Sequence, residues 1–135
     1  MDRVFDTTGA LLAALAFGTG AFVSFVLAPM VFRVLEPAAA SRFLRAMFPR
    51  YYAFLLACGA GVGLAALGRP GLLPAAAVLA ALAAASLALV PRINAARDKG
   101  PAGARQFRRL HGLSVLLNLA MLAASGWLVA GYVAG

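Results

Sequence analysis

Residues 72–90 read LLPAAAVLAALAAASLALV and contain no charged side chain, and Pro91 and Arg92 close the run. A helix needs about 20 consecutive apolar residues to cross the hydrocarbon core of a bilayer. Strands of a membrane barrel alternate apolar and polar residues, which this run does not do. Because lipid offers no partner to backbone N–H and C=O groups, such a segment spans a membrane as a helix. The run therefore predicts a transmembrane helix.

Working outward from this run, three further apolar stretches predict three more spans. We place the four spans at about residues 10–32, 51–68, 72–91 and 110–133, within a single integral membrane domain. The composition agrees, since 64% of the residues are hydrophobic and 12% are charged. A soluble domain has about 45–50% apolar and about 25% charged residues.

The basic residues indicate how the chain is oriented. Ten of the twelve Lys and Arg residues lie in the two segments that join span one to span two and span three to span four. These are Arg33, Arg42, Arg45, Arg50, Arg92, Arg97, Lys99, Arg105, Arg108 and Arg109. Lys and Arg are retained on the cytoplasmic side, where they meet anionic lipid head groups. We therefore predict cytoplasmic basic loops and extracytoplasmic termini, in the inner membrane if the cell is bacterial.

The net charge of +8 does not indicate nucleic-acid binding, because no aromatic and basic reading surface accompanies it. The charge is concentrated in the two loops, so membrane lipids are the predicted partners of these residues.

The first basic loop has a helical pattern of its own. Residues 41–48 place apolar side chains on one face and arginines on the other, between Pro37 and Pro49. Such a segment is typical of a helix that lies on the membrane surface. The predicted fold is therefore all-α, a four-transmembrane-helix antiparallel bundle with a short interfacial helix between spans one and two.

Small residues predict where the helices pack closely. Membrane helices associate through small side chains that let their backbones approach. Gly59 and Gly63 form such a pair in span two, and Ala77 and Ala81 lie one turn apart in span three. These contacts could close the monomer or join two copies into a homo-oligomer.

Polar residues within or beside the spans form one candidate site. His111, Ser114 and Asn118 are spaced three and four residues apart, so they share one face of the fourth helix. Antiparallel packing brings Asn94, Arg33, Tyr51 and Tyr52 to the same end of the bundle. The group predicts a cytoplasm-facing polar pocket, and the alternative interpretation is that Asn118 is a hydrogen-bonding contact between helices.

Four motifs resemble a known family. They are FVLAPMVF at residues 25–32, MFPRYY at 47–52, INAARD at 93–98 and FRRLHGLSVLLNL at 107–119. Together they resemble the transmembrane protein 205-like family. The resemblance implies a small four-helix membrane protein of a kind found in bacteria and eukaryotes, without a settled activity. Its recurring polar positions would be Asn94, His111, Ser114 and Asn118.

Three functions remain open at this point. The protein could bind or pass a small solute or ion through the polar pocket. It could instead be a haem- or metal-binding redox protein, with His111 as an axial ligand and Met30 or Met121 as the second. It could also be a structural or assembly subunit of a membrane complex.

The residue pattern disfavours an enzyme and a dedicated metal site. The four acidic residues, Asp2, Asp6, Glu36 and Asp98, all lie outside the spans. No paired carboxylates, no Ser-His-Asp set and no phosphate-binding loop are present in the sequence. No catalytic residue is therefore predicted, and the identity of any cofactor stays open.

Overall fold

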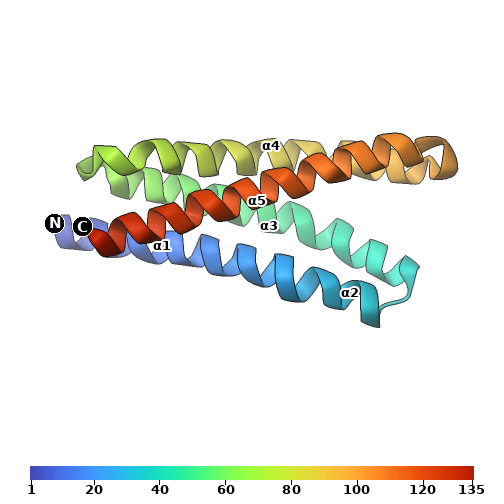
Figure 1. Cartoon of the computed structure of the whole chain (residues 1–135), viewed down its shortest axis with the longest axis horizontal. Coiled ribbons are helices and arrows are strands. Elements are labelled where there is room, and N and C mark those ends of the chain that lie inside the picture. Colours follow the sequence, from blue (N-terminus) through green and yellow to red (C-terminus); the bar gives the residue numbers. More distant parts are fainter.

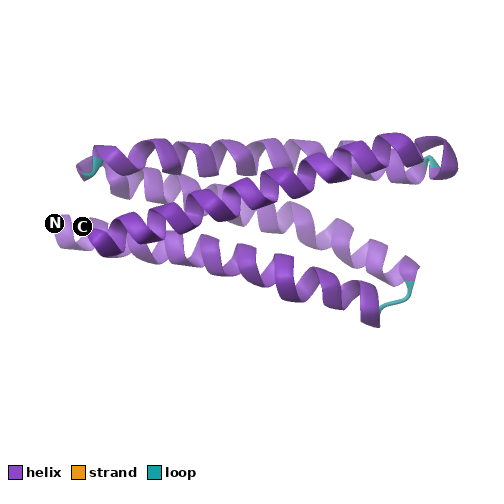
Figure 2. Cartoon of the chain, viewed as in Figure 1, coloured by secondary structure: helices purple, strands orange, loops and turns teal.

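The computed structural model describes the whole chain, residues 1–135, apart from the side chain of Asp2. In this described part, four long helical segments run antiparallel, and the N- and C-termini lie at the same end of the bundle (Figure 1). Helices and short connections make up the described backbone, and it contains no strand (Figure 2). The predicted all-α antiparallel bundle is confirmed.

Each segment is longer than its predicted span. The first contains α1 (Asp2–Phe22), a π-helical turn (Val23–Leu27) and α2 (Ala28–Val34). The second is α3 (Pro37–Ala65), and the third is α4 (Leu73–Asp98), with short 3₁₀ turns between them. The fourth is α5 (Ala104–Ala134), which follows a 3₁₀ turn at Gly100–Gly103. All four segments are long and apolar enough to cross a membrane.

The turns at the basic end follow from local backbone chemistry. Glu36 precedes Pro37 and is extended, with ψ of 148°, because a proline disfavours helical geometry at the residue before it. Pro37 then occupies the first turn of α3, where its missing N–H costs nothing. At the other basic turn, Gly100 has a φ of +61°, a left-handed conformation that glycine adopts without strain.

The predicted interfacial helix is not a separate element, and this detail of the prediction is wrong. Residues 41–48 are helical, but they form the first turns of α3, which continues through Pro49 into the second span. A proline inside a helix removes one hydrogen bond but does not always end the helix. Leu44 is buried and packs with Val31 and Ala40, so this part of α3 lies against α2.

A π-helical turn interrupts the first segment just before Pro29. The N–H of Ala28 donates to the carbonyl of Val23, five residues back, as a π-helix requires. Pro29 has no N–H, so the ladder of hydrogen bonds must adjust in its neighbourhood. The turn contains Ser24, whose position proves important for the site.

The backbones of α3 and α4 approach closely at a glycine. A Cβ added to Gly59 would lie 2.9 Å from the backbone nitrogen of Ala80, so the two backbones leave no room for a side chain there. A Cβ on Gly63 would lie 4.0 Å from the Cβ of Ala76, which is ordinary van der Waals contact. Gly59 is therefore the position at which close helix packing requires a glycine.

Ala77 and Ala81 take no part in the packing within the bundle, because both residues are exposed on the outer face of α4, and their use in joining two copies stays a prediction. The contact line runs one residue earlier, through Ala76 and Ala80, and continues along the buried face of α4 at Leu79 and Ala83. α4 carries apolar side chains on all of its faces. The sequence pattern therefore does not show which of two adjacent lines of alanines is buried.

Candidate functional site

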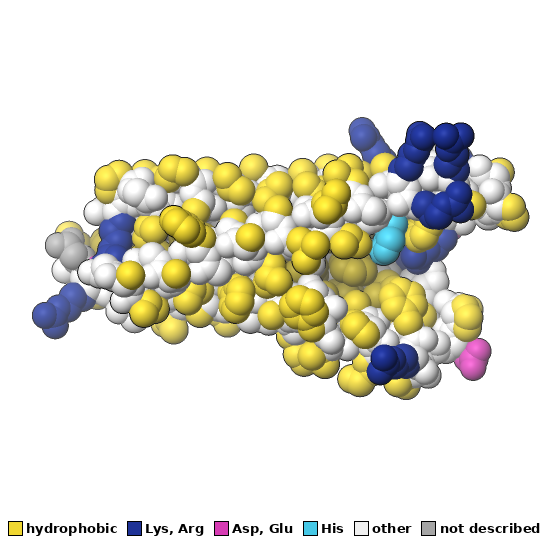
Figure 3. Space-filling view, viewed as in Figure 1, with side chains coloured by type: hydrophobic (Ala, Val, Ile, Leu, Met, Phe, Trp, Pro, Cys, Tyr) yellow, Lys and Arg dark blue, Asp and Glu magenta, His cyan; other side chains and the backbone are white. Residues whose placement is uncertain are grey.

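A cleft of about 430 Å³ opens in the side of the bundle at the end that carries the basic turns. At this end α2 and the beginning of α3 diverge from α4 and α5 (Figure 1). Figure 3 shows the hollow with apolar side chains inside it, the histidine at its rim and Lys and Arg side chains gathered beyond it. The volume is within the range of small-molecule sites, about 300–1,000 Å³.

The walls of the cleft are mostly apolar. Phe25 and Phe32 come from the first segment, Leu44 and Phe48 from α3, and Leu119 from α5. Phe25 is 66% exposed, Phe32 64% and Leu119 47%, so the cleft is open along its side and is not an enclosed cavity. In a membrane an opening in this direction faces lipid at the depth of the spans.

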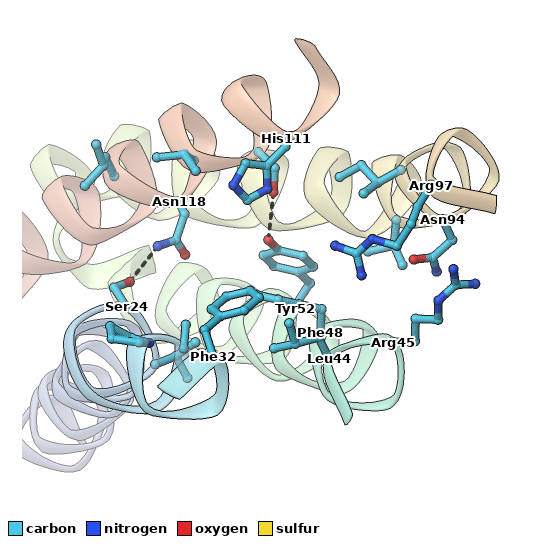
Figure 4. A pocket seen from close by; sticks show the side chains of 18 of the residues that line it. Ser24, Phe32, Leu44, Arg45, Phe48, Tyr52, Asn94, Arg97, His111 and Asn118 are labelled. Carbon is cyan, nitrogen blue, oxygen red and sulfur yellow. Dashed lines mark hydrogen bonds between the residues drawn. The ribbon is translucent and has the colours of Figure 1, made fainter. Parts of the chain in front are cut away.

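Asn118 lies at the inner end of the cleft and connects three segments. The hydroxyl of Tyr51 on α3 donates to the Asn118 amide oxygen at 2.8 Å. The Asn118 amide nitrogen donates to the hydroxyl of Ser24, in the π-helical turn, at 2.7 Å (Figure 4). Both ends of the amide are thus satisfied by protein, as a polar group within a membrane span requires.

A second polar pair lies one helical turn closer to the mouth. The hydroxyls of Tyr52 and Ser114 are 3.2 Å apart, within hydrogen-bond distance. The Tyr52 ring is buried and stacks on Phe48, with ring centroids 5.6 Å apart. The polar side chains at the bottom of the cleft are therefore fixed by one another.

Three side chains form a layered arrangement at the mouth. The rings of His111 and Phe107 stack with centroids 5.7 Å apart and an interplanar angle of 11°. The guanidinium of Arg97 lies over the Phe107 ring, 4.8 Å from its centroid. In Figure 4 the Arg97 side chain points into the cleft, toward Tyr52 and Phe48.

An ion pair joins α3 to the end of α4 beside this mouth. Arg45 makes two hydrogen bonds to the Asp98 carboxylate, one of them 3.2 Å long between Nη1 and Oδ2. Both residues lie beyond the predicted spans. The hydrogen bond from Arg45 lowers the pKa of Asp98 below its ordinary value, and the charges of Arg45 and Arg97 lower it further. The pair therefore links α3 to the end of α4 next to Arg45, which lines the cleft.

The structure brings most of the predicted site residues to one place. His111, Ser114, Asn118, Asn94 and Tyr52 line the cleft. Tyr51 does not line it, but supports Asn118 from beneath.

Arg33 was predicted to join the same pocket, and this is wrong. It lies near the end of α2 with its side chain exposed, outside the residues that line the cleft. Its position in the sequence gives its depth in the bundle but not the direction in which it points.

Sequence reasoning missed Ser24, Arg45 and Arg97. Ser24 is a single hydroxyl in a long apolar run, and Arg45 and Arg97 looked like two more members of the basic loops. Helix periodicity could have placed Ser24 next to Asn118 only if the π-helical turn had been known.

The side chains proposed as haem ligands are not placed together. Met121 is ten residues from His111 on the same helix, a separation of about 15 Å along the axis. Met30 is exposed on α2 and does not line the cleft. Within the described residues, no group of three or more His, Cys, Asp or Glu side chains could hold a metal ion. The residues present do not fit an intramolecular haem or metal site.

These features define the chain as an integral membrane protein, a bundle of transmembrane helices with a lateral cleft. The family model described as a domain of unknown function, DUF4149, matches residues 11–102, about two thirds of the chain. The chain belongs to this DUF4149 family. The matched region includes Ser24, Tyr51, Tyr52 and Arg97, and it ends before His111. No curated protein and no solved structure was found to match the chain.

Proposed function

We propose that this membrane protein binds a small apolar or amphipathic molecule in the lateral cleft. The observation that carries this proposal is the cleft itself, a volume of about 430 Å³ with apolar walls and a few fixed polar groups. Binding sites for small molecules share this composition, since apolar contact supplies affinity and a small number of polar groups fix orientation.

The interior supports binding more than passage. The cleft ends at the network of Ser24, Asn118 and Tyr51. Beyond it the largest fully buried side chains are the apolar Leu55, Leu79, Met121, Leu128 and Val62, accompanied by two single hydroxyl groups, those of Ser86 and Ser125. An ion or polar solute that crosses the bundle would lose its hydrating water molecules and gain no equivalent protein partners. This loss costs several kcal/mol for each polar group.

The orientation of the cleft follows from the charge distribution. Both basic turns lie at the open end of the bundle, and the two termini lie at the opposite end (Figures 1 and 3). Since Lys and Arg accumulate on the cytoplasmic side, we assign the cleft to the cytoplasmic leaflet and the termini to the other side. In a bacterial cell this membrane would be the inner membrane.

A pair of matched variants tests the proposal. Leu119 lines the cleft, whereas Leu116 lies three residues earlier on α5 and faces away from it, 65% exposed. Leu119→Trp should fill the cleft, while Leu116→Trp adds the same side chain to the outer surface.

Native mass spectrometry of protein extracted gently from its own membrane provides the readout. We expect a bound small molecule on the wild type and on Leu116→Trp, and its loss from Leu119→Trp. A wild type that carries no small molecule, or equal retention by the two variants, would contradict the proposal.

A further inference from the structure

Arg97 lines the cleft with its guanidinium over the Phe107 ring, and no carboxylate pairs with it in the described part of the chain. A guanidinium has five N–H donors. Within the described part of the chain, Arg97 donates one hydrogen bond, to the Ser41 hydroxyl at 3.4 Å, and it has no carboxylate partner. It is partly buried, and its guanidinium points into the cleft (Figure 4).

The surroundings of Arg97 are short of negative charge. The residues that line the cleft include Arg45 and Arg97 and no carboxylate. Asp98 lies nearby but is hydrogen-bonded to Arg45, so the local group of Arg45, Arg97 and Asp98 has a formal charge of +2 − 1 = +1. Burial and the neighbouring Arg45 lower the pKa of Arg97, although a guanidinium stays protonated in proteins. A partly desolvated cation of this kind is stabilised by an anion.

The charged and the apolar groups of the cleft lie at the membrane depths expected for the head and the chain of an amphiphile. Arg97 lies six residues beyond the predicted end of span three, about 9 Å along the helix axis, at the level of lipid head groups. The apolar walls, with Phe25 and Leu119, lie within the predicted spans at the level of acyl chains. The side opening of the cleft would let a chain extend into lipid while its head stays beside Arg97.

On this basis, and resting on the proposed function, we propose that the cleft binds an anionic amphiphile whose phosphate or carboxylate head pairs with Arg97. Arg97 would supply two parallel N–H donors to the head, and Asn94 and His111, which also line the mouth, would supply further polar contacts. Basic pockets between transmembrane helices on the cytoplasmic side bind anionic lipid heads by this chemistry. The ligand could come from the bilayer as a phospholipid or from a free fatty acid, because both present the same charge on an apolar chain.

Two matched pairs of probes distinguish these sources. Phosphatidylglycerol is compared with phosphatidylcholine, and oleate with oleyl alcohol, by titration into delipidated protein followed by native mass spectrometry. For the wild type we expect the anionic member of at least one pair to bind about tenfold more tightly, the effect of one charge-assisted hydrogen-bonding group. Preference within the phospholipid pair identifies a bilayer lipid, and preference within the oleate pair identifies a free acid.

The residue is tested by Arg97→Gln against Arg92→Gln, which removes the same charge from the exposed surface of the same helix. We expect Arg97→Gln to bind both members of the preferred pair equally and Arg92→Gln to keep the wild-type preference. If Arg97→Gln does not fold, Arg97→Lys, which keeps the charge, should retain a reduced preference.

The possible failures separate the two proposals. Equal binding within both pairs by the wild type overturns the anionic ligand, and so does a preference that survives Arg97→Gln. Where Leu119→Trp still abolishes that binding, the cleft remains a binding site of different ligand chemistry. If Leu119→Trp does not reduce the binding of any of these probes, both the anionic ligand and the cleft as a binding site are overturned.

Discussion

The amide of Asn118 on α5 accepts a hydrogen bond from the hydroxyl of Tyr51 on α3, with 2.8 Å between the two heavy atoms. The same amide donates to Ser24, so one side chain connects the first, second and fourth segments of the bundle. The contact lies at the inner end of the cleft and separates it from the apolar core. It therefore marks the inner end of the cleft and holds the three segments together there.

Removing this contact should destabilise the protein by a measurable amount. A double-mutant cycle of Tyr51→Phe and Asn118→Ala should give a coupling energy of about 0.6–2 kcal/mol, as for other hydrogen bonds between membrane helices. The free energy of unfolding in mild detergent is the quantity to measure.

Tyr132→Phe is the matched control for this cycle. The Tyr132 hydroxyl is buried, and in the described part of the chain it has no hydrogen-bond partner. Its removal should leave the stability unchanged or raise it, because no bond is lost. A coupling energy of zero between Tyr51 and Asn118 would contradict the assignment of this hydrogen bond.

Two glycines of α3 should respond differently to the same substitution. Gly59→Ala places a methyl group against the backbone of Ala80, and overpacking of this kind costs about 1–3 kcal/mol. Gly63→Ala meets only ordinary contact with Ala76 and gains helix propensity, about 1 kcal/mol. Thermal unfolding in detergent should show a lower Tm for Gly59→Ala and an equal or higher Tm for Gly63→Ala. The reverse order would mean that α3 and α4 pack in another register.

The ion pair of Arg45 and Asp98 predicts a particular pH dependence. Because the pKa of Asp98 is lowered in the folded protein, chiefly by the hydrogen bond from Arg45, protonation favours the unfolded chain. The stabilisation is fully present above the ordinary Asp pKa of about 3.9 and is lost as the pH falls through the lowered folded value. The Tm of the wild type should exceed that of Asp98→Asn at pH 7, and the difference should disappear in acid.

Glu36→Gln serves as the control for this pH series. Glu36 is exposed and makes no ion pair in the described part of the chain. Its Tm curve should follow that of the wild type between pH 7 and acid. A difference between wild type and Asp98→Asn that does not change with pH would show that the carboxylate acts by packing and not by charge.

The predicted orientation can be tested with single cysteines. Cys58 is buried, so the native thiol should react little with a membrane-impermeant maleimide. On intact cells we expect labelling of Leu67→Cys, at the α3–α4 turn, and labelling of Lys99→Cys only after the membrane is opened. Labelling of Lys99→Cys on intact cells, without labelling of Leu67→Cys, would reverse the orientation.

The sequence allowed the helices to be predicted because each span is a long apolar run bounded on at least one side by charged residues or prolines. It also allowed Asn118, Ser114 and His111 to be grouped, since residues three and four apart on a helix share a face. The resemblance to transmembrane protein 205-like proteins, the homo-oligomer and the lipid partners stay predictions.

The remaining features depend on helix rotation and on backbone irregularity. Ala77 and Ala76 differ by one position in a uniformly apolar helix, so only packing decides which of them is buried. The π-helical turn sets the rotation of Ser24 relative to α5, and helix periodicity does not describe such a turn. Arg45 and Arg97 are distinguished from the other loop arginines by lining the cleft, which depends on the rotation of α3 and α4.

Photo-crosslinking with a diazirine-labelled oleate, followed by peptide mapping, would test the central claim most directly. If the cleft binds an amphiphile, adducts should concentrate on its walls, at residues 23–32 and 114–119, and should be lost in Leu119→Trp but not in Leu116→Trp. Adducts spread evenly over the lipid-facing surfaces of all four segments, and unchanged by Leu119→Trp, would contradict it.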